Sequence, residues 1–446
     1  MGKYFGTDGI RGKANSHPIT AEMALNVGRA VTCHFRETSD EPTVVVAKDT
    51  RISGDMIVSA IIAGICSKGG NAVYAGILPT PALPVMIAET GAAAGIMISA
   101  SHNPYYDNGI KLFGKSGHKL SDEVESSIEA LIDHCDIGNC SDSEIGVMHL
   151  DERNSLESYL AFLKKAMPPD FDLTGFHVVL DCSNGATYKA APEIFARFGA
   201  KVSVICAKPD GYNINDGCGS QHTGMLSEKV RETCAHAGLA FDGDGDRLIS
   251  VDEKGDVLTG DQLLVIFADF LKKRGKLKNN TVVATVMSNL GFKKAMDALD
   301  IVCRITDVGD RYVYEEMNKA GAVLGGEDSG HIIFLNRHTT GDGILSGLML
   351  MNAIRYEKKP LSEMKKMRIF PQKIKNVDVT EKKPIETIPG LMEAIREAEK
   401  ALGKNGRVYV RYSGTQNLLR IMVEAPTEEE TILICDDIAR LVKTAL

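Results

Sequence analysis

The chain of 446 residues lacks the features typical of membrane, secreted and nucleic-acid-binding proteins. It has no apolar run of about 18 residues, the length that a membrane-spanning helix requires. Its first residues lack the apolar core of a secretory signal peptide. The net charge is −8 and no basic block is present, which argues against nucleic acid as the main partner. We therefore expect a cytoplasmic protein without a membrane or nucleic-acid partner.

The cysteines show no spacing of a redox or zinc motif. None of the ten forms a CxxC pair or a Cys/His zinc pattern, and several, such as Cys66 and Cys206, lie in apolar stretches. This favours buried, reduced thiols. Tryptophan is absent, which excludes nothing about function. The composition is that of a globular protein, and the length predicts three or four domains.

One pattern occurs three times along the chain. A short apolar strand, a polar glycine-containing loop, a helix and a second strand begin at residues 44, 178 and 281. Such units form parallel strand pairs, so three copies predict three related α/β domains. The remainder from Pro371 to Leu446 has strand-like runs and two amphipathic helices, at 391–402 and 428–443. This pattern predicts a smaller C-terminal α+β domain.

The most informative stretch is the sequence DGDGDR at 242–247, which directly follows the apolar run 238–241. Glycines allow the loop to curl so that Asp242, Asp244 and Asp246 face one point. Carboxylates crowded in this way repel one another unless a hard cation such as Mg²⁺ lies between them. Arg247 can bind a phosphate brought to that ion. The alternative interpretation is a turn whose acidic side chains are solvated. The motif by itself does not indicate which reaction is catalysed.

A second polar loop, SASHNP at 99–104, follows the apolar run 95–97. It exposes a hydroxyl, and Ser101 is the better nucleophile candidate, with His102 beside it and Lys111 ten residues on. A capping loop before the turn at Asn103-Pro104 is the alternative.

Three further loops carry polar groups. The sequence GGEDSGH at 325–331 follows a strand, and its Glu327 and Ser329 can bind sugar hydroxyls. The sequence RYSGTQN at 411–417, together with Arg420, combines arginines, hydroxyls and a glycine as a phosphate site would, although a hairpin with exposed arginines fits too. The glycine-rich loop at 6–12 contains Arg11 but lacks the spacing of a nucleotide-binding loop.

The polar loops are thus distributed over the predicted domains. This distribution suits a phosphosugar that is held in a cleft between the domains.

The four motifs SASHNP, DGDGDR, GGEDSGH and RYSGT, in this order, resemble the α-D-phosphohexomutase superfamily over the whole chain. Three stretches are most similar to its phosphoglucosamine mutase branch: KYFGTDGIRG at 3–12, NINDGCGSQH at 213–222 and VGDRYV at 308–313. The resemblance implies three α/β domains with mixed sheets, a smaller C-terminal domain and an active site in the central cleft. We expect the boundaries 1–153, 154–253, 254–368 and 369–446.

The resemblance also implies roles for the motif residues. Ser101 would carry the phosphoryl group as phosphoserine, and it would bind one Mg²⁺ per subunit together with Asp242, Asp244 and Asp246. Glu327 and Ser329 would bind the sugar, and Arg247 would steady the transferring phosphate. His102 would belong to the catalytic residues as well. Arg11, Lys111 and His331 would form the acid/base and charge-stabilising group, and which of these three transfers the proton is left open. The non-reacting phosphate would be bound by Arg411, Ser413, Gly414, Thr415 and Arg420.

The expected reaction converts glucosamine 6-phosphate into glucosamine 1-phosphate through glucosamine 1,6-bisphosphate, which reorients without leaving. A hinge near 356–370 would let the fourth domain accept either orientation. The product would enter UDP-N-acetylglucosamine synthesis, and the protein would be a monomer or homodimer. A mutase for glucose or mannose phosphates, a phosphatase and a non-catalytic phosphosugar-binding protein are the alternatives.

Three positions differ from the usual motifs of the superfamily. Gln416 and Asn417 replace the usual Glu-Pro after the phosphate-binding glycine, and Asp328 stands where Gln is frequent. We expect Asp328 to point to solvent, where one charge contributes little.

Overall fold

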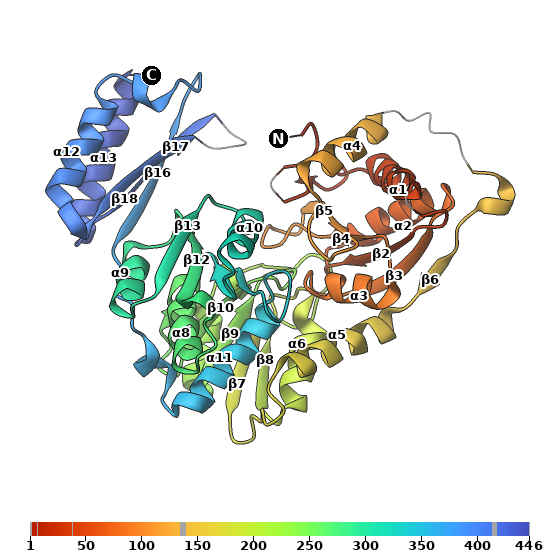
Figure 1. Cartoon of the computed structure of the whole chain (residues 1–446), viewed down its shortest axis with the longest axis horizontal. Coiled ribbons are helices and arrows are strands. Elements are labelled where there is room, and N and C mark those ends of the chain that lie inside the picture. The colour runs from red at the N-terminus through yellow and green to blue at the C-terminus, as the bar shows by residue number, and fades with distance from the viewer. Residues whose placement is uncertain (1, 7, 38, 134–139, 413–416, 446) are drawn as a thin grey trace. The chain divides into compact units, whose positions relative to one another are not determined.

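The computed structural model of the chain describes residues 2–6, 8–37, 39–133, 140–412 and 417–445 (Figure 1). By their contacts the residues form two compact units. The first comprises Met1–Val286 and Arg304–Lys365, and the second comprises Met287–Cys303 and Lys366–Leu446. Among the described residues, no helix is long and apolar enough to cross a membrane.

The N-terminal sheet has six strands in the order β1-β5-β4-β2-β3-β6. Strand β2 pairs in parallel with β3 and β4, whereas β5 pairs antiparallel with β1 and β4, so the sheet is mixed. Its elements are β1 (Ile10–Lys13), α1 (Ala21–Arg36), β2 (Thr43–Lys48), α2 (Gly54–Cys66), β3 (Asn71–Ile77), α3 (Ala82–Thr90), β4 (Ala94–Ile98), β5 (Asp107–Gly114), α4 (Asp122–Asp133) and β6 (Met148–Leu150).

The second sheet has the order β11-β10-β9-β7-β8. Strand β7 pairs in parallel with β8 and β9, and β10 runs antiparallel to β9 and β11. Its elements are α5 (Glu152–Ala166), β7 (His177–Asp181), α6 (Thr187–Arg197), β8 (Lys201–Ile205), α7 (Gly224–Thr233), β9 (Ala237–Phe241), β10 (Leu248–Asp252) and β11 (Val257–Leu258).

The third sheet has the order β13-β12-β14-β15, with β12 parallel to β14 and β14 antiparallel to β15. Its elements are α8 (Gly260–Lys273), β12 (Thr281–Thr285), α9 (Leu290–Ala298), β13 (Val302–Thr306), α10 (Asp310–Ala320), β14 (Leu324–Gly326), β15 (Ile332–Phe334) and α11 (Gly343–Glu357). The three predicted strand-loop-helix-strand units are therefore present.

The C-terminal sheet is antiparallel, in the order β16-β18-β17, and α12 and α13 lie together on one side of it (Figure 1). Its elements are β16 (Gln372–Asp378), α12 (Leu391–Leu402), β17 (Arg407–Tyr412), β18 (Leu418–Glu424) and α13 (Glu428–Ala445). Both predicted helices and the α+β class of this domain are confirmed.

Burial explains why these segments form the core. In β2, Val44, Val45 and Val46 are fully buried because parallel strands in a layered α/β domain are covered on both faces. The prediction that the cysteines are buried is only partly right. The nine described cysteines form no disulfides, but Cys66 and Cys206 are half-buried and Cys234 is exposed.

The four motif loops share one architectural feature. Each joins two neighbouring antiparallel strands, at the point where their pairing ends. These strand pairs are β4–β5, β9–β10, β14–β15 and β17–β18. In the three motif loops that the structure describes in full, at 99–104, 242–247 and 325–331, the sheet framework on both sides fixes the loop ends, so these loop residues are held in place by rigid strands.

Candidate active site

Ser101 lies in the loop between β4 and β5 and is almost completely buried, so the expectation that this loop exposes its hydroxyl is wrong. Its φ of +52° lies in the left-handed region, where a non-glycine residue is strained and which is enriched at functional sites. The Ser101 Oγ donates a hydrogen bond of 2.5 Å to Asp242 Oδ2. Its N–H donates to Ser99 Oγ at 2.9 Å. The structure thus brings the predicted nucleophile onto the predicted metal loop.

Arg51, which is fully buried, binds the backbone of the Ser101 loop. Its guanidinium donates to the carbonyl oxygens of Ser101 at 2.9 Å and Asn103 at 2.8 Å, and also to that of Pro104. Its Nε donates to Asp49 Oδ2 at 2.8 Å, and this carboxylate also accepts from Ser99 Oγ at 2.6 Å. A rigid planar donor set of this kind positions the loop backbone.

The DGDGDR loop is the tight turn of the β9–β10 hairpin, as the glycine spacing predicted. Gly245 has φ +73°, a conformation that glycine adopts without strain. Gly243 is needed for a different reason. A Cβ at this position would lie 2.5 Å from the Ser101 carbonyl oxygen and 2.7 Å from Asn215 Nδ2. Only glycine lets the two loops approach this closely.

Asp242, Asp244 and Asp246 are buried, and they place carboxylate oxygens within 4.8 Å of one another. Burial and the charges of Asp246 and Asp244 raise the pKa of Asp242. The buried Oδ1 atoms of Asp244 and Asp246 have no hydrogen-bond partner among the described residues. A divalent cation would satisfy these oxygens and remove the repulsion, so the three acids can hold a metal ion.

Lys111 supplies a fixed positive charge beside these acids. Its Nζ lies 2.8 Å from Asp244 Oδ2, 3.2 Å from Asp8 Oδ2 and 3.9 Å from Asp246 Oδ2. Burial alone would lower the pKa of Lys111, but these carboxylates raise it well above its usual range. The side chain is therefore an ammonium that neutralises charge at the site.

Arg11 joins the same network through Asp8. Asp8 pairs with Arg11 and with Lys119, and Lys119 Nζ also lies 2.6 Å from Asp310 Oδ2. Burial opposes ionisation of Asp8, but the three surrounding cations hold the pKa of its carboxyl well below its usual range. Arg11 and Lys111 thus share one carboxylate.

The pKa values of the two histidines shift in opposite directions. His331 Nδ1 lies 3.6 Å from Asp246 Oδ2, and this acid raises the pKa of His331 although burial opposes the rise. Burial, with Arg247 and Arg11, lowers the pKa of His102 to about 4. His102 is therefore neutral at pH 7, and its buried Nδ1 has no partner among the described residues.

The GGEDSGH loop joins β14 to β15, as predicted for a loop at a strand end. Glu327 Oε1 accepts from the Gly309 N–H at 3.1 Å, and Ser329 Oγ has no hydrogen-bond partner among the described residues. Asp328 is exposed, as expected, and its Oδ1 accepts from the Asp261 N–H at the start of α8.

A small cavity of about 160 Å³ is lined in part by the charged residues Lys119, Asp310 and His331. Its other walls come from 113–121 and 311–340, so the first and third sheets both contribute. Tyr314 OH and His118 Nε2 join the two sides at 2.7 Å.

The predicted phosphate site lies in the second unit. Arg411 on β17 pairs with Arg420 on β18, and both line a cavity of about 250 Å³ with Tyr409 and Asn376. The buried Arg420 Nε has no hydrogen-bond partner in the described part of the chain. Ser413, Gly414, Thr415 and Gln416 lie outside the described residues. Asn417, the other residue of this loop that differs from the usual motif of the superfamily, is exposed.

Asp49, Arg51 and Asp8 orient the motif loops but were not predicted from the sequence. Asp49 and Arg51 directly follow β2, and this position after a buried strand was the signal available for them. Lys119 and Asp310 were missed as charged partners, because the residues that meet them are distant in sequence.

Comparison with known proteins identifies the class of enzyme to which the chain belongs. Four models of phosphoglucomutase/phosphomannomutase match the chain: domain I at residues 2–136, domain II at 157–255, domain III at 259–370 and the C-terminal domain at 374–441. A phosphoglucomutase/phosphomannomutase family protein from Burkholderia thailandensis has the same fold, with a TM-score of 0.81, 23% identity and coverage of 99% and 97% of the two chains. The chain is thus an isomerase of the phosphohexomutase type.

Proteins that are similar in sequence identify the family within this class. The chain is 51% identical to the phosphoglucosamine mutase of Syntrophus aciditrophicus over 100% of both chains. It is 48% identical to that of Bacillus anthracis, over 98% of this chain and 96% of the other. The chain belongs to the phosphoglucosamine mutase family.

Proposed function

We propose that the chain interconverts glucosamine 6-phosphate and glucosamine 1-phosphate, with Ser101 as the phosphoryl carrier. The observation that carries this proposal is the Ser101 Oγ–Asp242 contact, which places a strained, buried hydroxyl at a three-carboxylate loop. The full-length similarity to phosphoglucosamine mutases supports the amino sugar as substrate. In cells the product would feed UDP-N-acetylglucosamine synthesis.

In the first transfer the bond between phosphorus and Ser101 Oγ breaks, and a bond forms between phosphorus and a sugar hydroxyl oxygen. The hydroxyl proton passes to a protein base. In the second transfer the bond between phosphorus and the other phosphate-bearing sugar oxygen of glucosamine 1,6-bisphosphate breaks, that oxygen takes the proton back, and phosphorus bonds to Ser101 Oγ again. Such transfers depend on alignment and charge neutralisation more than on a strong base. Lys111 and Arg247 supply positive charge beside the acids.

The residues for a Mg²⁺ ion are Asp242, Asp244, Asp246 and Ser101. Their fit rests on the two unpartnered carboxylate oxygens and on an all-oxygen donor set, which magnesium prefers. When bound, the ion would neutralise charge on the transferring phosphoryl group. The solved Aspergillus fumigatus N-acetylphosphoglucosamine mutase, 17% identical with a TM-score of 0.67 over 100% and 96% of the two chains, was crystallised with GlcNAc-6P and magnesium.

His102 is the proton acceptor in this proposal. Arg11 pairs with Asp8, and Lys111 is an ammonium beside Asp244, so both groups stabilise negative charge and neither is the proton acceptor. The neutral imidazole has an unpartnered Nδ1 and can accept one. A weak base is sufficient, because the transition state of phosphoryl transfer is loose.

Arg411 and Arg420 would bind the non-reacting phosphate. Guanidinium groups bind phosphate through two parallel hydrogen bonds, and the unpartnered Arg420 Nε provides one such donor. Glu327 and the free Ser329 hydroxyl would bind sugar hydroxyls.

The test compares kcat/KM for glucosamine 6-phosphate, glucose 6-phosphate and mannose 6-phosphate, each with Mg²⁺ and a trace of its bisphosphate. We expect a strong preference for the amino sugar and loss of turnover in Ser101→Ala. Full activity of that variant would refute the mechanism. Preference for glucose or mannose would keep the mechanism and refute the substrate, and steady release of inorganic phosphate would indicate a phosphatase.

A further inference from the structure

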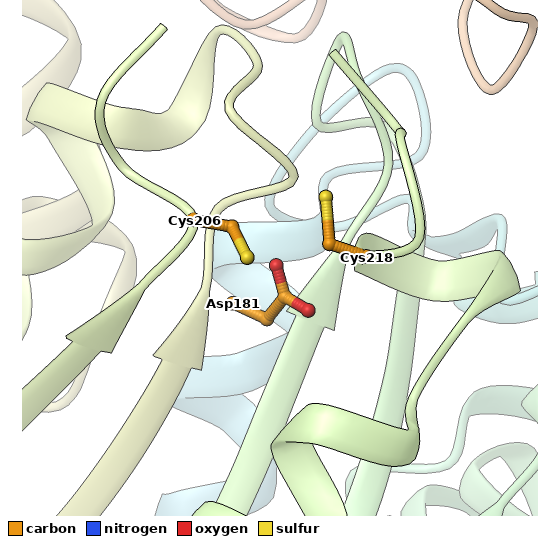
Figure 2. Close-up of side chains that lie close together, drawn as sticks. All are labelled: Asp181, Cys206 and Cys218. Atoms are coloured by element: carbon orange, nitrogen blue, oxygen red, sulfur yellow. The ribbon is translucent and has the colours of Figure 1, made fainter. Parts of the chain in front are cut away.

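Three potential metal ligands gather in the second α/β domain, apart from the DGDGDR loop (Figure 2). Asp181 is the last residue of β7, and Cys206 directly follows the neighbouring parallel strand β8. Cys218 comes from the segment that returns after β8 and immediately precedes Gly219. The sheet therefore brings together residues that the sequence spacing did not associate.

The geometry of this cluster fits a metal site. One Asp181 carboxylate oxygen and the Sγ atoms of Cys206 and Cys218 all lie within 4.8 Å of one another. Ligands of a tetrahedral Zn²⁺ stand about 3.5–3.8 Å apart, given metal–ligand distances of about 2.0–2.3 Å. The ligand atoms would therefore have to approach one another by at most about 1.3 Å to reach these separations.

Asp181 supplies a second observation that points to a cation. Its side chain is fully buried, and its oxygens accept from the N–H groups of Ser183 at 2.9 Å and Gly219 at 2.8 Å. None of its contacts among the described residues is an ion pair with Lys, Arg or His. A buried carboxylate without a positive partner is costly, and a bound cation would compensate it.

We propose that Asp181, Cys206 and Cys218 bind one zinc-class divalent cation. Two thiolates select a borderline or soft ion over Mg²⁺, so this site would be chemically distinct from the three-carboxylate loop. Three protein ligands leave the fourth position of a tetrahedral ion for water. Binding releases the two thiol protons to the buffer, so the affinity rises with pH.

The location of the site gives the ion a structural consequence. The segment between Cys206 and Cys218 contains Asn215, whose Nδ2 donates to the carbonyl oxygens of Ser101 at 2.9 Å and Asn103 at 3.1 Å. An ion that joins both ends of this segment would restrain the group that holds the Ser101 loop. The site is inferred from its own geometry and does not depend on the proposed function.

Cobalt titration of the reduced full-length chain tests the proposal. Excess Mg²⁺ is present to occupy the carboxylate loop, and Co²⁺ reports thiolate ligands by charge-transfer absorption. We expect one Co²⁺ per chain with this band, displaced by Zn²⁺, and release of about two protons, as measured by calorimetry in two buffers. Cys206→Ser and Asp181→Asn should each weaken Co²⁺ binding at least about tenfold.

Cys234→Ser is the matched control, because this exposed thiol at the end of α7 lies in the same domain but outside the cluster. It should bind Co²⁺ like the unmodified chain. Since Cys206 is only half-buried, Cys206→Ser should fold, and its thermal unfolding midpoint verifies this.

Two outcomes would overturn the proposal. One is the absence of a thiolate band, or equal affinity in Cys206→Ser. The other is a Cys206–Cys218 disulfide in the unreduced protein, seen by mass spectrometry, combined with no Co²⁺ binding after reduction. That second result would identify a redox pair instead of a metal site.

Discussion

The close approach of Gly243 to the Ser101 loop makes Gly243→Ala the sharpest test of the site. An alanine Cβ would lie 2.5 Å from the Ser101 carbonyl oxygen, whereas ordinary contacts begin at 3.4 Å, so the atoms must separate by about 0.9 Å. The neighbour is backbone and cannot rotate away. Misplacing a reacting group by about 1 Å lowers turnover roughly 100-fold. Overpacking of this kind also destabilises by about 1–3 kcal/mol.

The assay measures kcat for glucosamine 6-phosphate together with the free energy of unfolding in urea. We expect kcat to fall about 100-fold while the chain stays folded at assay temperature. Gly224→Ala is the matched control, because a Cβ at this first residue of α7 meets nothing within 4 Å. It should keep full activity.

Unchanged kcat in Gly243→Ala would refute the reasoning, since the Ser101 loop would then tolerate displacement. A loss of activity that parallels a fraction of unfolded protein would refute it as well. Measurement well below the unfolding midpoint separates these cases.

Two further predictions concern groups that support the site. Arg51→Met leaves the buried Asp49 carboxylate without its partner and should destabilise the chain by about 3–5 kcal/mol in urea unfolding; a change below about 1 kcal/mol would contradict the role of Arg51. Burial raises the pKa of Asp342, which accepts from Tyr159 OH at 3.0 Å and from the Leu345 N–H, to about 7. The folded state then holds a proton that the unfolded state loses near its ordinary value, so stability falls as pH rises from about 4 to 7, by up to about 4 kcal/mol. Asp342→Asn should remove this dependence in thermal unfolding measured across that range, and an unchanged pH profile would show that Asp342 is not its source.

The sequence alone was sufficient for the class and order of the domains. The apolar runs at 44, 178 and 281 form strands because a fully buried strand must be apolar on both faces. The amphipathic helices at 391–402 and 428–443 could be predicted because one face of each helix is apolar and packs against the C-terminal sheet. The acid-glycine alternation of DGDGDR also predicted its turn and its crowded carboxylates, because these depend only on local geometry.

Several features required the tertiary structure. Arg51 reaches carbonyl groups about fifty residues away, and Lys111 meets Asp244 across two sheets, so no spacing in the sequence relates them. The pKa of His102 is lowered by burial and by nearby arginines, whereas Asp246 raises the pKa of His331 against the effect of burial. The cluster of Asp181, Cys206 and Cys218 was missed because a zinc motif was sought in local spacing, whereas adjacent strands bring these ligands together. Local patterns thus determine elements and turns, but pairing between distant charges is decided by which strands become neighbours.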